Sequence, residues 1–140
     1  MENISFKEFL QESLSKSVLW KWITKASDLW KAEFFIDNKK YQVVFESEDS
    51  ENWELIFALR FNGKLSVKLT NTGDAFIVFG TVKEIFNDWL KKNSKNMMSI
   101  KFTADEKSRK KLYFRLVKMI SKEHKLNYYE AEPGEYILEP

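Results

Sequence analysis

The chain has 140 residues, of which 44% are hydrophobic and 31% charged, and its formal net charge is +2. This is the composition of one ordinary globular domain and excludes a disordered segment. The chain contains no cysteine and one histidine, His124, which excludes disulfides, a cysteine nucleophile and the usual zinc sites. No apolar run approaches the ~20 residues of a membrane span, and the first residues lack the apolar core of a signal peptide. We therefore expect no metal, no membrane insertion and a cytosolic location.

The first predicted element is an N-terminal helix over residues 5–16. Ser5 and Glu8 have the spacing of a capping box, and apolar residues recur there at helical intervals. The segment 18–30 that follows is ambiguous, because Trp20 and Trp22 alternate as in a strand but the run is short. It receives no assignment.

Alternating apolar residues then predict a four-strand antiparallel meander with one buried face. The predicted strands are 30–36, 41–47, 53–61 and 65–69. Asp37-Asn38-Lys39-Lys40 supplies the first turn, since Asp and Asn tolerate a left-handed backbone. Asn62-Gly63 is a strong hairpin signal between the last two strands.

Helical periodicity returns after residues 71–74. The stripe of the predicted helix consists of Phe79, Val82, Ile85, Phe86, Trp89 and Leu90. A short strand follows, with Met98, Ile100 and Phe102 on one face. Residues 105–123 predict another amphipathic helix, and a terminal hairpin over 127–131 and 135–138 turns at Pro133-Gly134, the residues of a type II turn.

This order predicts an α+β fold. It is a single, mainly antiparallel sheet, built from the meander and then an α-β-α-ββ half, with the N-terminal helix and two amphipathic helices packed on one or both faces. We take residues 1–140 as a single domain, in which 1–28 form the helix and connecting segment, 29–70 the meander and 71–140 the second half.

Charge is locally segregated although the total is nearly balanced. The stretch 107–125 holds eight Lys or Arg residues and one acid, whereas 46–54 holds five acids and no base. Both are candidate docking surfaces as well as ordinary solvated faces. The candidate binding residues of the basic helix are Lys107, Ser108, Arg109, Lys110, Lys111, Arg115 and Lys118.

A second candidate site is the start of the helix after the meander, because free N–H groups at a helix N-terminus can hold an anion. Its residues are Thr72, Gly73, Asp74, Gly80 and Thr81. The same residue types also serve ordinary turns and helix caps, and that interpretation stays open. The chain contains neither a Walker motif nor a Gly-x-Gly-x-x-Gly motif.

One pattern in the sequence extends over more than half of the chain. It comprises Tyr41-x-Val43-x-Phe45, Trp53-Glu54-Leu55-x-Phe57, the run from Thr72 to Val82, Ile100-x-Phe102-x-Ala104, and Ser108-Arg109-x-x-Leu112-Tyr113-x-Arg115-Leu116. Through this pattern, residues 41–118 resemble a family of small uncharacterised tailed-phage proteins. The resemblance implies a phage or prophage origin and no assigned activity.

The order of elements also resembles the GNAT acyltransferase fold, in which a meander precedes a helix, a strand, a second helix and a closing hairpin. Within this resemblance Tyr113, after Leu112, matches the family tyrosine that can act as a general acid. The glycine-rich acyl-CoA loop of the family should fall near 76–82, where this chain has the single glycine Gly80. This departure favours a non-catalytic relative.

We therefore expect a non-enzymatic, phage-encoded binding protein. It would be an accessory, host-interaction or minor virion component that acts through its charged surfaces on a protein partner, in the host cytosol or in the virion, without a cofactor. Two alternatives stay open: a degenerate GNAT-like acyl-CoA transferase, and a nucleic-acid-binding module using the basic helix 107–125. Assembly into a homo-oligomer is a further possibility.

Overall fold

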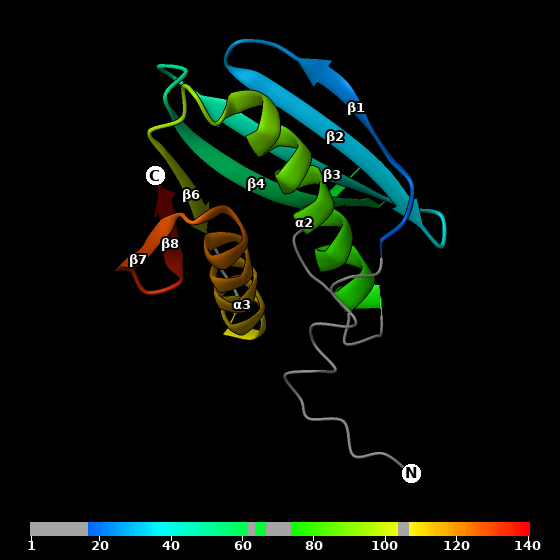
Figure 1. Cartoon of the computed structure of the whole chain (residues 1–140). Helices are drawn as coiled ribbons and strands as arrows, with labels where there is room; N and C mark the ends of the chain where they lie inside the picture. The colour runs from blue at the N-terminus through cyan, green and yellow to red at the C-terminus, as the bar shows by residue number, and fades with distance from the viewer. Residues whose placement is uncertain (1–16, 62–63, 67–73, 104–106) are drawn as a thin grey trace.

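The computed structural model describes residues 17–61, 64–66, 74–103 and 107–140 (Figure 1). The predicted helix 5–16 and the predicted turn Asn62-Gly63 lie outside these residues. The strands are β1 (Trp20–Lys25), β2 (Leu29–Ile36), β3 (Lys39–Ser47), β4 (Asn52–Phe61), β5 (Lys64–Ser66), β6 (Ser99–Thr103), β7 (Asn127–Glu132) and β8 (Glu135–Glu139). The helices are α2 (Asp74–Asn93) and α3 (Lys107–His124).

The strands form one open sheet in the order β1-β2-β3-β4-β6-β8-β7, with the short β5 paired to β4. Neighbouring strands are antiparallel except β4 and β6, which run parallel. The predicted α+β class and the antiparallel meander are therefore confirmed. Residues 65–66 of the predicted strand 65–69 belong to β5, and the rest of it lies outside the described residues. One additional strand precedes the predicted meander.

That additional strand is β1, in the segment that sequence analysis left unassigned. Trp20 lies opposite Phe34 and Trp22 opposite Ala32, so both rings join the buried face of β2. The Trp20 Nε1–H donates to Glu84 Oε1 at 3.0 Å and the Trp22 Nε1–H to Asp88 Oδ2 at 2.8 Å. The alternation at these two tryptophans is thus a strand signal, completed by partners on α2.

Two turns follow the predicted chemistry. Asp37 and Asn38 have φ values of 49° and 65°, the left-handed conformation of a two-residue hairpin loop between Ile36 and Lys39. β3 therefore begins at Lys39, two residues before the predicted start. Gly134 has φ 81°, as the third position of a type II turn requires after a proline.

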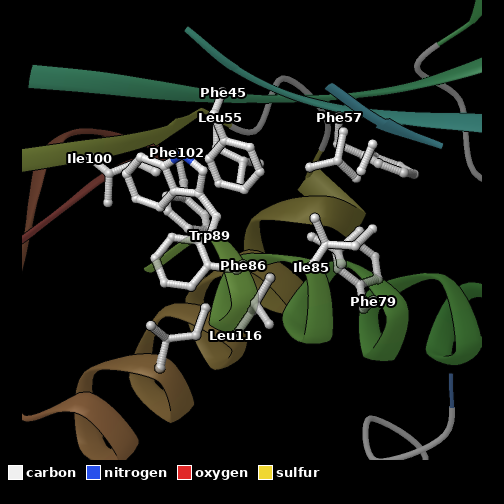
Figure 2. Packing of buried hydrophobic residues seen from close by; sticks show 14 of the residues in the cluster. Phe45, Leu55, Phe57, Phe79, Ile85, Phe86, Trp89, Ile100, Phe102 and Leu116 are labelled. Atoms are coloured by element: carbon white, nitrogen blue, oxygen red, sulfur yellow. The ribbon is translucent and has the colours of Figure 1, made fainter. Parts of the chain in front are cut away.

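The core lies on one face of the sheet, under both helices (Figures 1 and 2). The predicted stripe of α2 is confirmed, since all six of its residues are buried. Trp89 is central: its ring stacks on Phe45 of β3 at 4.7 Å and meets Trp53 of β4 edge-on at 5.1 Å. α3 adds Leu116, Val117 and Ile120. Each large side chain buried in this way contributes about 1.5–3 kcal/mol.

One predicted core position is wrong. Met98 was expected beside Ile100 and Phe102, but β6 begins at Ser99 and Met98 is 59% exposed. The N–H of Met98 donates to Glu51 O at 2.8 Å, in the turn before the strand, and the neighbouring Met97 is buried instead. Because β6 begins one residue after Met98, the strand alternation that would place Met98 on the core face does not extend to it.

The opposite face of the sheet is covered by no helix within the described residues; we call it the open face. Its side chains alternate with those of the core and include Glu33, Gln42, Val44, Glu54, Ile56, Lys101 and Ile137. Glu33 is held there between Lys40 at 3.1 Å and Lys21 at 3.4 Å. Burial alone would raise the pKa of Glu33, but the hydrogen bonds and charges of these lysines outweigh it and lower the pKa.

Candidate functional site

A hollow of about 680 Å³ lies on the open face, at the end of the sheet where the β1–β2 and β3–β4 connections meet. Its carboxylates come from Asp28, Glu46, Glu48, Asp49 and Glu54, and among the described residues Lys101 is the one cation that lines it. Leu29 and Ile137 contribute apolar surface. We call this site the acidic hollow.

Strand register brings the charges of the hollow together. Glu46 on β3 lies directly opposite Glu54 on β4, and Glu54 in turn neighbours Lys101 on the parallel strand β6. Like charges directly opposite each other on paired strands destabilise a sheet. The Lys101 Nζ lies 3.6 Å from Glu135 Oε1, so its charge is shared with a carboxylate outside the hollow.

The β3–β4 loop is fixed by its own hydrogen bonds. The carboxylate of Asp49 accepts from the backbone N–H of Asn52 at 2.8 Å, from the Asn52 side-chain amide at 2.9 Å and from the backbone N–H of Glu51 at 2.9 Å. These donors hold the pKa of Asp49 well below its ordinary value. Ser99 Oγ on β6 donates to Asn52 Oδ1 at 2.8 Å, which ties the loop to the sheet.

The β1–β2 turn is anchored to the same end. Ser47 N–H donates to Asp28 O at 3.0 Å, where β3 ends. Both connections that carry acidic residues are therefore held in place by backbone hydrogen bonds before any partner arrives. A preformed site of this kind loses little conformational entropy on binding.

The chemistry of the hollow is electrostatic. In the described part of the chain no group of three or more Asp, Glu, His or Cys side chains could hold a metal ion. Four of the five carboxylates are exposed and Glu54 is half-buried, whereas general acid–base catalysis uses carboxyls held in position against a substrate. Exposed carboxylates grouped in this way are suited to attract several positive charges on one extended partner.

The structure places the predicted basic residues on α3. Lys107, Ser108, Arg109, Lys110 and Lys111 occupy its first turns, and Tyr113 follows, but these side chains lie outside the described set. Arg115 is half-buried and takes part in contacts, whereas Lys118 is exposed. The Lys118 Nζ lies 5.2 Å from the centre of the Phe114 ring, a cation–π arrangement.

The structure describes only part of the predicted helix-start site. Thr72 and Gly73 lie outside the described residues and Asp74 is the first residue of α2. Gly80 and Thr81 were expected beside the helix start, but they lie two turns inside α2 and are buried. Thr81 Oγ1 donates to Ile77 O at 2.8 Å and accepts from Val18 N–H at 3.1 Å, so it anchors the chain before β1.

His124, which ends α3, is held in a structural contact. Its Nε2 lies 2.8 Å from Asn87 Oδ1 on α2. Burial and the nearby charges of Lys83 and Lys91 lower the pKa of His124 below its ordinary value of 6.5, against the opposing effect of Glu123. The neutral imidazole is therefore favoured in the fold.

Sequence reasoning found the acidic stretch 46–54 but not the hollow that it lines. One signal was available: Glu46 and Glu54 alternate with Phe45 and Leu55, so both must lie on the face away from the core. The contributions of Asp28, Lys101 and Ile137 come from segments distant in sequence, and only the strand order reveals them.

No protein-family model matches this chain, and neither the curated proteins nor the solved structures compared with it give a significant match. The helices in the described residues include none long and apolar enough to cross a membrane.

Proposed function

We propose that this protein is a non-enzymatic binding protein whose acidic hollow takes a basic segment of a protein partner. The observation that carries the proposal is the imbalance of charge in a preformed concave site: five carboxylates face one lysine. In keeping with the phage resemblance, we assign it to the accessory, host-interaction or minor virion proteins of a phage.

The opposed pair Glu46 and Glu54 supports a cationic partner. Two carboxylates on directly paired strands repel each other, and a positive side chain between them would turn this repulsion into attraction. The apolar surface of Leu29 and Ile137 gives the aliphatic stems of lysine or arginine a place to pack. The site therefore combines charge selection with contact area.

The acyltransferase alternative rests on topology. A meander followed by a helix, a strand, a second helix and a closing hairpin is the order of elements that the GNAT resemblance implies. Gly80, the glycine expected in its acyl-CoA loop, instead lies inside α2. This position favours the non-enzymatic function.

The nucleic-acid alternative rests on α3. Phe114 is 37% exposed, contacts Tyr128 at 6.2 Å and carries Lys118 over its ring. Aromatic faces beside cations are used to stack bases of single strands. The near-neutral net charge of +2 favours a protein partner over nucleic acid, because dedicated nucleic-acid binders are usually more basic.

The test is a binding titration with a fluorescein-labelled octalysine peptide, followed by anisotropy at low salt. We expect the double variant Glu46→Gln/Glu54→Gln to bind on the order of tenfold more weakly than the wild type, because two partly exposed ion pairs are lost. Circular dichroism checks that the fold is kept.

The matched control is Asp37→Asn/Glu132→Gln, which changes the net charge equally but lies outside the hollow. Asn suits the left-handed turn position of Asp37. The control should bind like the wild type, and equal weakening in both double variants would refute the hollow as the site. A labelled single-stranded oligonucleotide in the same assay tests the nucleic-acid alternative, where tight binding weakened by Lys118→Gln would favour it.

A further inference from the structure

The exposed side of α3 carries a row that complements the acidic hollow. Phe114, Lys118 and Lys122 follow each other at intervals of four residues, so they form one stripe along the helix. All three are exposed, and the two lysines make no ion pair with any described residue. The stripe presents an aromatic side chain followed by two positive charges.

The distance between the two lysines along α3 matches the distance between the carboxylates of Glu46 and Glu54 across their paired strands. Residues four apart on a helix are separated by about 6 Å along its axis, and side chains opposite each other on paired antiparallel strands are about 5 Å apart. Lys118 and Lys122 can therefore meet Glu46 and Glu54 at the same time. Leu29 on β2 lies opposite Glu46, so Phe114, one further step along the stripe from Lys118, then faces Leu29.

We propose that the basic segment bound by the acidic hollow is the α3 stripe of a second copy of this chain. This inference rests on the proposed function, because it names the partner of the same site. It commits to a second copy because this chain itself carries the complementary charge.

The geometry makes this contact head-to-tail. The hollow belongs to the open face, while α3 packs on the opposite face of the sheet (Figure 1). Two copies cannot engage both surfaces reciprocally when these point in opposite directions, so each contact leaves one hollow and one α3 stripe free. Such heterologous contacts build open chains of molecules rather than a closed dimer.

The edge strands β1 and β7 are irregular, which disfavours association through them. β1 has a register shift between Trp22 and Thr24, and β7 has one between Glu130 and Glu132. Irregularities of this kind blunt edge strands against pairing with another sheet.

The test is sedimentation of the full chain at about 0.05 M and about 0.5 M salt, across which screening shortens the reach of charges severalfold. We expect association that grows with protein concentration at low salt and monomers at high salt. Lys118→Gln/Lys122→Gln and Glu46→Gln/Glu54→Gln should each be monomeric at low salt, whereas the control Lys39→Gln/Lys91→Gln should associate like the wild type.

Mixing the two monomeric variants gives the decisive readout. The first keeps an intact hollow and the second an intact α3 stripe, so together they should form a one-to-one complex that cannot grow. A monomeric wild type, a mixture that stays monomeric or single variants that associate like the wild type would each overturn the proposal. Octalysine binding by Lys118→Gln/Lys122→Gln must persist if the hollow is a binding site, so the proposed function is judged separately.

Discussion

At the scale of single residues, His124 reports on the packing of α3 against α2. It is the only histidine in the chain, and its contact with Asn87 uses the neutral ring at ordinary pH. Few other side chains titrate between pH 5 and 7. His124 is therefore the first residue to examine for a dependence of stability on pH in that interval.

We predict that the free energy of unfolding falls as the pH drops below 6.5. Because the pKa of His124 is lowered in the fold, the unfolded chain binds the proton more readily, so acid favours unfolding. The slope should stay below ~1.4 kcal/mol per pH unit, the limit for one proton. Urea denaturation from pH 5 to 7.5 measures it, and His124→Gln should flatten the curve. A variant that keeps the full slope would contradict the assignment.

At the scale of elements, β1 is attached to α2 through polar contacts. Trp20 and Trp22 donate to Glu84 and Asp88, and the Val18 N–H donates to the buried hydroxyl of Thr81. The Trp22 and Lys92 hydrogen bonds to Asp88 lower the pKa of this carboxyl, outweighing the effect of its partial burial. These contacts define how the first strand enters the sheet.

We predict that Thr81→Val destabilises the protein by about 1–2 kcal/mol, because it leaves the partly buried Val18 N–H without an acceptor. Thr81→Ser keeps the hydroxyl and is the matched control, with a smaller loss from the missing methyl group. Urea denaturation measures both. If the serine variant proves the less stable of the two, the hydrogen bond is not what secures β1.

The elements that sequence patterns predicted correctly depend on local chemistry. Asp37-Asn38 determines its own turn, and the stripe of α2 needs only helical periodicity. β1 was not predicted, because its sequence signal consists of two tryptophans whose hydrogen-bond partners lie more than sixty residues away. The role of Thr81 could not be predicted from local sequence either, because its hydroxyl accepts a hydrogen bond from Val18, 63 residues away.

At the scale of the whole molecule, the acidic hollow is a region where the fold and the proposed function make opposing demands. Glu46 and Glu54 oppose each other on paired strands, an arrangement that weakens the sheet. Sites selected for binding often retain such unfavourable contacts, and substitutions that remove them stabilise the protein at the expense of function. Glu33, by contrast, is paired with Lys21 and Lys40.

We predict that Glu46→Lys raises the free energy of unfolding by about 0.2–1 kcal/mol at low salt, because it converts a repulsive cross-strand pair into an attractive one. The gain should shrink at about 0.5 M salt, where the exposed charges are screened. The same variant should lose octalysine binding, since the hollow gains a positive charge. Urea denaturation at the two salt concentrations, with Glu139→Lys on β8 as a control whose cross-strand partner Asn127 is neutral, separates the local pair from the change in net charge. An equal change in the free energy of unfolding in both variants would show that repulsion between Glu46 and Glu54 does not weaken the sheet. That repulsion would then no longer support a basic partner for the hollow.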